Sequence, residues 1–179
     1  MNRLKKITAT GIGIALFVVL SVCLQVPVFE NYYLCLGYIA MIVYLYNVDT
    51  ISGTAVGVLG TILYCVLISG LRGVPGWAIG NIAIGVILGP YFAARKKKEF
   101  TTVNLKARIA ILDAILIIVA VGIGILGIKS IVEVILYAQP FFVRIAKNFN
   151  AFVADCVVIY LSIPVAAAVS KAYKKIYNG

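Results

Sequence analysis

Lysine and arginine gather in four short clusters along this chain, and the stretches between them are apolar enough to cross a lipid bilayer. A hydrocarbon core about 30 Å thick needs roughly 20 apolar residues in a helix, and hydrophobic residues make up 63% of the 179 residues. The sequence therefore predicts an all-α integral membrane protein. The four clusters are Arg3/Lys5/Lys6, residues 95–98, Lys106/Arg108 and Lys171/Lys174/Lys175.

The positions of these clusters predict how the chain crosses the membrane. Lysine and arginine in short loops are retained on the cytoplasmic side, so both termini and a central loop are expected inside the cell and the number of crossings is even. Polar and turn-forming residues divide the apolar stretches into about six helices of a single transmembrane domain, residues 1–179. These helices are expected at residues 7–28, 34–46, 51–68, 77–94, 106–128 and 145–169.

Two segments depart from a simple spanning helix. The second apolar stretch is short, which predicts a helix that is buried among the others or tilted against them. Residues 129–140 follow the fifth helix and are polar in places but still largely apolar. We expect them to form an interfacial or partly re-entrant cap on the outer side.

The residue types that the chain lacks exclude several functions. It has no histidine and only six acidic residues, which removes Ser-His-Asp catalysis and most metal sites. We therefore expect neither an enzyme nor a bound metal or cofactor. The four cysteines have no CxxC spacing and are interpreted as small apolar residues rather than disulfides or metal ligands. The net charge of +10 follows from the positive-inside rule, so we expect no nucleic-acid partner.

Small residues recur at helix-packing spacings in three of the expected helices. Because such residues let two backbones approach closely, they predict close helix contacts. In the first helix, Gly11 and Ala15 could face either a helix of this chain or one of another protein, and the spacing leaves both interpretations open. The other two sets are Gly53, Gly57 and Gly60, and Gly80, Gly85 and Gly89.

Polar residues enter the last expected helix along one face. Helical periodicity aligns Arg144, Asn148, Ala151 and Asp155. Asp155 lies about ten residues into the helix, roughly 15 Å deep at 1.5 Å per residue, where a carboxylate must face protein, water or a ligand. It is therefore expected to point inward, either as an internally bonded structural acid or as a contact to a ligand or ion. Asp113, nearer the cytoplasm, is interpreted as structural or as a subunit contact.

Three outer segments carry aromatic, amide and charged side chains at the same expected depth. They are residues 30–33, Arg72, and Trp77 with Asn81 one helical turn later. Aromatic faces with a few amides and charges are what a pocket for a flat, polar small molecule needs. The alternative is that tryptophan and tyrosine only anchor the chain at the membrane interface, where they are enriched in membrane proteins generally.

Residues 6–20, residues 50–60 and the asparagine-containing start of the last helix resemble the substrate-binding S components of energy-coupling factor (ECF) vitamin transporters. The resemblance covers nearly the whole chain through loose motifs. It implies a bundle of about six helices, with both termini inside the cell, in the plasma membrane of a prokaryote. It also implies capture of a water-soluble vitamin or related micronutrient at the outer face, toppling of the protein in the membrane, and release inside.

The resemblance further implies partners and site residues. Energy would come from two ATPase subunits through a transmembrane coupling subunit, in keeping with the absence of GxxxxGK[ST] from this sequence. The coupling subunit would contact Gly11 and Ala15, where Gly11 replaces the alanine typical of the family. By segment, substrate binding would fall on Asn31, Tyr32, Tyr33, Arg72, Trp77, Asn81, Tyr137, Gln139, Asn148, Asn150 and Asp155.

Other functions stay open as alternatives. The main one is a self-sufficient small transporter or channel in which Asp155 and Asp113 relay a proton or ion, although the chain shows no inverted repeat. A membrane enzyme acting on lipids and a structural or assembly subunit are further alternatives. The vitamin is also left open, because the outer residues carry both signs of charge. Their aromatic, weakly basic character favours a neutral or anionic ring compound.

Overall fold

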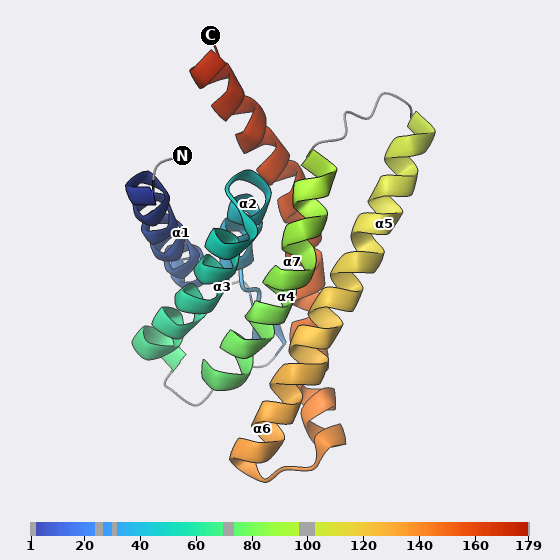
Figure 1. Cartoon of the computed structure of the whole chain (residues 1–179). Coiled ribbons are helices and arrows are strands. Elements are labelled where there is room, and N and C mark those ends of the chain that lie inside the picture. The colour runs from blue at the N-terminus through green and yellow to red at the C-terminus, as the bar shows by residue number, and fades with distance from the viewer. Residues whose placement is uncertain (1–2, 24–26, 30–31, 70–73, 97–102, 179) are drawn as a thin grey trace.

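Apolar helices make up nearly all of the chain that the structure describes. The computed structural model describes residues 3–23, 27–29, 32–69, 74–96 and 103–178. Two short segments, η1 and η3, are π-helical. In chain order the elements are α1 (Arg3–Cys23), β1 (Pro27–Phe29), β2 (Tyr32–Tyr33), α2 (Gly37–Asn47), α3 (Thr50–Tyr64), η1 (Cys65–Ser69), α4 (Val74–Lys96), α5 (Val103–Val121), η3 (Gly122–Lys129), α6 (Ser130–Tyr137) and α7 (Phe141–Asn178) (Figure 1).

Five helical columns are long and apolar enough to cross a membrane. They are α1, α3 with η1, α4, α5 with η3 and α6, and α7. Large apolar side chains, among them Leu67, Ile118 and Phe142, are more than half exposed on the outside of the bundle. An apolar surface of this kind is unfavourable in water and suits contact with lipid. The predicted all-α membrane bundle is confirmed.

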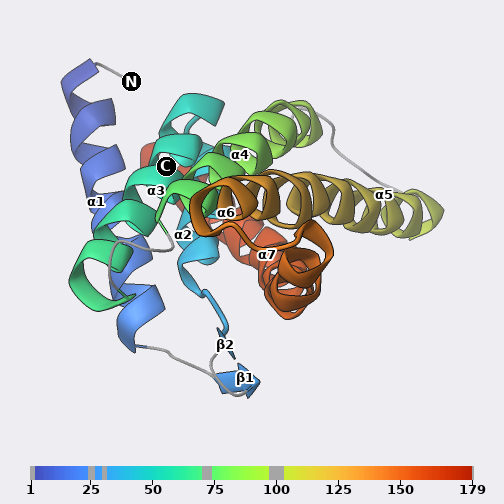
Figure 2. The ribbon, with the colours of Figure 1, turned by 90° about the horizontal axis from the view of Figure 1, so that it is seen from below.

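The second expected helix is α2, which is short and central. Its 11 residues span about 16 Å at 1.5 Å per residue, too little to cross the hydrocarbon core upright. It packs against α1, α3, α4 and α7, with α1 and α3 on one side of it and α5, α6 and α7 on the other (Figure 2). Tyr38, Met41 and Ile42 are fully buried. The predicted burial of this helix among the others is confirmed.

Several predicted helix boundaries were wrong. The first helix ends at Cys23 rather than at residue 28, and Pro27–Phe29 instead pair in antiparallel fashion with β2, as expected for a proline that cannot donate a helical hydrogen bond. Residues 129–140 form no separate cap, because the fifth helix continues through η3 and α6 to Tyr137. The chain reverses at Ala138, whose φ is 48°. The last helix is longer than predicted at both ends.

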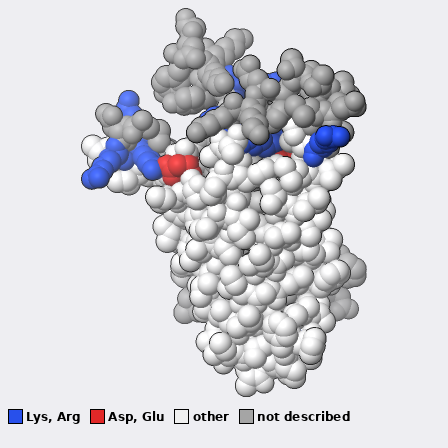
Figure 3. Space-filling view, turned by 45° about the vertical axis from the view of Figure 1, so that its right-hand side comes forward, with Lys and Arg blue, Asp and Glu red and all other residues white. Residues whose placement is uncertain are grey.

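Both termini lie at the same end of the bundle (Figure 1). On the face shown in Figure 3, the described lysine and arginine side chains gather at this end, and the surface below them carries neither sign of charge. The positive-inside rule assigns the basic end to the cytoplasm. The opposite end, where α2, α4 and α7 begin, is called the outer end here.

The packing of α3 and α4 depends on residues without side chains. A Cβ atom placed on Gly80 of α4 would lie 2.6 Å from the carbonyl oxygen of Gly124 in η3, and one on Gly60 of α3 would lie 2.6 Å from the Phe17 ring of α1. The predicted close contacts of the α3 and α4 glycines are therefore confirmed. Gly11 of α1 is different, because a Cβ there meets nothing within 4 Å.

The turn from α2 to α3 is fixed by one carboxylate. Asp49 caps α3 by accepting a hydrogen bond from the Ser52 backbone N–H at 2.7 Å, and it also forms an ion pair with Lys6 of α1. Partial burial acts to raise the pKa of Asp49, but the bonds from Lys6 and Ser52 outweigh it and hold the pKa below its ordinary value of 3.8. The carboxylate is therefore charged at neutral pH and ties α1 to the start of α3.

Gly80→Ala is predicted to destabilise the fold. The added methyl group would collide with rigid backbone rather than with a movable side chain, a strain that typically costs about 1–3 kcal/mol. Thermal unfolding of the purified protein in detergent measures the loss. Gly11→Ala is the matched control, since it adds the same group where nothing lies within 4 Å. Equal melting temperatures for the two variants would contradict the packing described.

Candidate functional site

A continuous hydrogen-bond network lies in the outer half of the bundle, where α2 and α4 begin and α3 ends. The indole Nε1 of Trp77 donates to the Tyr38 hydroxyl at 2.9 Å, and this hydroxyl donates to Asn81 Oδ1 at 2.8 Å. The Asn81 amide donates in turn to Thr61 Oγ1 at 2.8 Å and to the Gly57 carbonyl at 3.1 Å. One buried amide thereby joins three helices. We call Tyr38, Thr61, Trp77 and Asn81 the Tyr38 network.

Helix periodicity explains why these side chains meet. Trp77 and Asn81 are one turn apart on α4 and so share a face, which turns toward α2 and α3. The indole also packs edge-on against the Tyr64 ring of α3, with 5.9 Å between ring centres. Trp77 remains half-buried while Asn81 is fully buried. The network therefore extends from the partly accessible ring of Trp77 to the fully buried amide of Asn81.

Asp155 faces the same network from α7. Its side chain is buried, and its carboxyl lies near enough to the Tyr38 hydroxyl to interact with it electrostatically. Lys129 of η3, which packs close to Gly76 at the start of α4, is a cation that interacts electrostatically with Asp155 without forming an ion pair with it in the described structure. The predicted inward orientation of Asp155 is confirmed. A buried carboxylate with a hydroxyl and a cation nearby can bind polar groups of a ligand without an exposed charge in lipid.

A second network joins α6 to the start of α7. Asn148 Nδ2 donates to Glu133 Oε2 at 2.9 Å and to Ser130 Oγ at 3.0 Å. Arg144 Nη1 lies 3.6 Å from the same glutamate oxygen, and the guanidinium lies 4.7 Å from the centre of the Tyr137 ring. These contacts fix the outer end of α6 on α7. We call Ser130, Glu133, Tyr137, Arg144 and Asn148 the Glu133 network.

Most of the predicted site residues that are described belong to one of these networks. Trp77, Asn81 and Asp155 meet at Tyr38, and Tyr137 and Asn148 meet at Glu133. These five residues thus lie in two separate networks, and the convergence of residues 30–33, Arg72 and Trp77 with Asn81 stays a prediction, because residues 30–31 and Arg72 lie outside the described part. Whether any of them binds a ligand stays a prediction.

The remaining predicted residues lie at the edges of the described structure. Gln139 follows α6, and its Oε1 atom is buried with no hydrogen-bond partner among the described residues. Asn150 is half-buried on α7. Tyr32 and Tyr33 form β2, which contacts α7, but their side chains fall outside the described part, and Asn31 and Arg72 fall outside it entirely.

Three contributors to the two networks were missed by the sequence interpretation. Tyr38, Lys129 and Glu133 provide the hub of one network, the cation beside Asp155 and the acceptor of the other. Nothing in the sequence separates Tyr38 from the other tyrosines. Glu133 could have been found, because an acidic residue in an apolar membrane segment requires an internal partner.

Asp113 belongs to a separate cluster at the cytoplasmic end. The Tyr91 hydroxyl donates to its carboxylate at 2.6 Å, and Arg95 Nη2 lies 2.8 Å from its other oxygen. These partners tie α4 to α5, which fits the structural interpretation of this acid. Among the described residues, no three acidic or cysteine side chains gather as a metal site would require. All four cysteines are free thiols, and Cys23 is exposed rather than buried.

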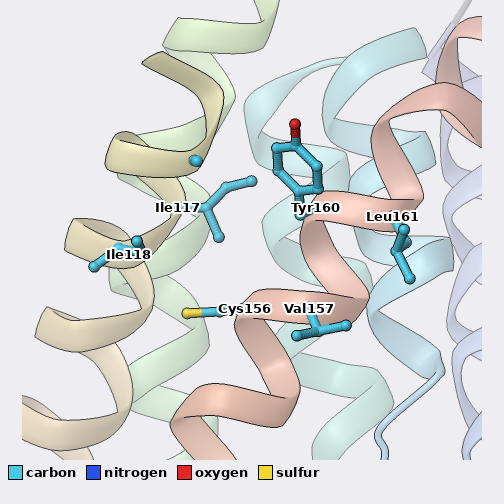
Figure 4. A pocket seen from close by; sticks show the side chains of 7 residues that line it. Ile117, Ile118, Cys156, Val157, Tyr160 and Leu161 are labelled. Atoms are coloured by element: carbon cyan, nitrogen blue, oxygen red, sulfur yellow. The ribbon is translucent and has the colours of Figure 1, made fainter. Parts of the chain in front are cut away.

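An apolar groove of about 220 Å³ lies between α5 and α7. It has the concave shape of a binding site but almost no polar surface that would orient a water-soluble ligand. It is therefore a weaker candidate for a substrate site than the networks. Its side chains lie on the two facing helices and are almost entirely apolar (Figure 4). The labelled residues are Ile117, Ile118, Cys156, Val157, Tyr160 and Leu161.

Comparison with known proteins gave one match. A family model described as the S component of the ECF-type riboflavin transporter matches residues 1–175. The matched range includes both networks and all of the long helices except the last three residues of α7. No curated protein and no solved structure matched.

Tyr38→Phe is predicted to lower thermal stability. It leaves the buried Asn81 Oδ1 and the Trp77 N–H without their partner, and an unsatisfied buried polar group costs about 1–3 kcal/mol. Unfolding of the purified protein in detergent measures the effect. Tyr160→Phe removes a hydroxyl from the exposed groove and is the control, for which we expect little change. A loss as large in Tyr160→Phe would show that the Tyr38 network has no special role.

Proposed function

We propose that this chain, which belongs to the family of ECF-type riboflavin transporter S components, binds riboflavin at its outer end and delivers it inward. The family is one of transport proteins, not enzymes, and its S components are the substrate-binding subunits of ECF importers. The observation that carries the proposal is the convergence of Trp77, Tyr38 and Asn81 beside Asp155. This site lies at the end of the bundle opposite the basic clusters.

The chemistry of the Tyr38 network suits a flavin. Riboflavin is a neutral, flat three-ring system, and aromatic faces such as those of Trp77 and Tyr64 favour stacking with a flat ring. One edge of the flavin carries alternating hydrogen-bond donors and acceptors, which match the carbonyl and amino groups of an amide. Because the Asn81 amide is already bonded to Tyr38, Thr61 and Gly57, a flavin would bond to it only by replacing one of these partners. The hydroxyls of the ribityl chain are donors for a carboxylate such as Asp155.

The outer rim of the site is proposed to come from less central residues. Gln139 supports this role because its buried carbonyl oxygen lacks a partner among the described residues, as an acceptor reserved for a ligand would. The Asn148 amide already donates hydrogen bonds to Glu133 and Ser130, so we assign it the role of positioning α6 against α7. The first and second outer loops, with Asn31, Tyr32, Tyr33 and Arg72, together with Tyr137 and Asn150, complete the proposed rim.

The coupling contact is proposed to lie on the lipid-facing side of α1. Gly11 and Ala15 are one turn apart and both are exposed, and small residues allow another helix to approach closely. Gly13, by contrast, faces inward toward Tyr44 and Val56. We propose that a transmembrane coupling subunit, driven by two ATPase subunits, packs against Gly11 and Ala15 in the plasma membrane.

Riboflavin is predicted to bind the purified chain in the absence of partners. Titration read by quenching of riboflavin fluorescence, with a thermal-shift panel of other B vitamins, measures affinity and selectivity. Trp77→Ala should weaken binding by roughly tenfold or more, since stacking on an aromatic side chain contributes about 1–3 kcal/mol. Trp77→Phe keeps a ring and should lose less.

Tyr160→Ala deletes an aromatic ring in the apolar groove between α5 and α7, which is not part of either network, and is the matched control. We expect it to leave riboflavin affinity unchanged. Correctly folded protein that binds no riboflavin would refute the proposed substrate, and a hit with a different vitamin would correct it. If Trp77→Ala bound riboflavin with full affinity, the proposed site would be refuted, but riboflavin would still be the substrate.

Ala15→Leu is predicted to separate binding from transport. A bulky side chain on the small face of α1 should block approach of the coupling subunit, so uptake by the reconstituted importer should fall severalfold or more while riboflavin binding by the chain alone persists. Ala168→Leu makes the same change on an exposed position of α7 and should transport normally. Equal uptake by both variants would place the coupling contact elsewhere.

A further inference from the structure

A large cavity lies at the cytoplasmic end of the bundle, away from both outer networks. Its volume is about 710 Å³, it is partly open, and it is lined by the start of α1, the end of α2, the turn before α3, and the far ends of α4 and α7. Ligand sites typically have volumes of about 300–1,000 Å³. The polar side chains of its wall are Lys6, Asn47, Asp49, Lys96, Ser170 and Tyr44, whose hydroxyl donates to the Ala9 carbonyl, and the other lining side chains are apolar.

The charged groups of this cavity come from helices distant in the sequence. Lys6 of α1 is ion-paired with Asp49, whose carboxylate is also engaged by the Ser52 backbone N–H. Lys96, near the end of α4, donates to the Asn47 carbonyl at 3.4 Å, which is long for a hydrogen bond. Two ammonium groups and one carboxylate give the wall a net positive charge.

The amide of Asn47 has a structural role in the cavity wall. It donates to the carbonyls of Val43 and Ala166 at 3.1 and 3.0 Å and so joins α2 to α7. The wall around the two lysines is therefore held in place by the fold. An ammonium group has three donors and can contact an anion and a neighbouring protein oxygen at once.

We propose that this cavity binds a phosphate group held between Lys6 and Lys96. Basic pockets between membrane helices on the cytoplasmic side are where anionic headgroups bind, and the apolar part of the wall suits the glycerol and acyl portion of an anionic phospholipid. A free phosphate in the cytoplasm offers the same anionic chemistry without the apolar part. The site lies at the opposite end from the riboflavin site and does not depend on it.

Basic residues at a cytoplasmic end are expected for topological reasons alone, so the test must separate the cavity from its surroundings. Lys5 and Lys171 are exposed at the same end and do not line the cavity. The double variant Lys5→Gln/Lys171→Gln therefore removes as much charge as Lys6→Gln/Lys96→Gln. It is the matched control for general attraction to anionic lipid.

The experiment uses the purified full chain in detergent. Phosphatidylglycerol or phosphatidylcholine is titrated, bound lipid is counted by native mass spectrometry, and stabilisation is read by thermal unfolding. A separate arm replaces lipid by sodium phosphate against sodium chloride at equal ionic strength. Phosphatidylglycerol should bind the unmodified chain selectively, and Lys6→Gln/Lys96→Gln should weaken this binding on the order of tenfold or more.

The control pair should retain binding, and Lys6→Arg/Lys96→Arg should recover most of it. Stabilisation by sodium phosphate, lost in the same cavity variant, would support the site with a free phosphate as its source. The proposal is overturned if the unmodified chain shows neither selectivity for phosphatidylglycerol over phosphatidylcholine nor any effect of phosphate. It is also overturned if the control pair loses as much binding as the cavity pair.

Discussion

A helix of 11 residues cannot cross a bilayer by itself, and the burial of α2 among four other helices is the constraint on which the rest of the structure depends. Because α2 ends inside the protein, the polar groups near its ends must be satisfied by neighbouring helices. At its outer end Tyr38 bonds with α4, and at its cytoplasmic end Asn47 bonds with α7. The candidate riboflavin site and the cavity proposed to bind phosphate thus lie at the two ends of the same helix.

Close approach of the surrounding helices is what makes this burial possible. Without a hydrophobic driving force inside lipid, helices associate through tight packing and hydrogen bonds. Gly80 lets α4 approach the backbone of η3 at Gly124, and the π-helical η3 leads directly to Lys129 and Ser130. The close packing of α4 and η3 at these glycines therefore also helps to fix where the polar groups of the two networks lie.

The membrane class and the helix order could be predicted from sequence because charge clusters and hydropathy act locally and independently of the final packing. The limits of α1 and α6 could not, since Pro27 ended a run that hydropathy alone would continue, and Glu133 was acceptable within a helix only because α7 supplies Asn148 and Arg144. The candidate site residues divide in the same way into those that could be identified from the sequence and those that could not. Asp155 was identifiable as an acid deep in a helix, and Trp77 with Asn81 as an aromatic and an amide one turn apart at the outer end, whereas Tyr38 acquires its importance from partners on other helices.

The hydroxyl of Tyr38 carries a single hydrogen atom. It already accepts from Trp77 and donates to Asn81, while the Asp155 carboxyl lies near enough to interact electrostatically with the same hydroxyl. The amide therefore holds the one hydrogen atom that Tyr38 has to donate, and the carboxylate does not receive it. A molecule that donates to Asn81 would release the Tyr38 hydroxyl, which could then turn toward Asp155 on α7. Tyr38 would thereby join α2 to α7 in place of α4.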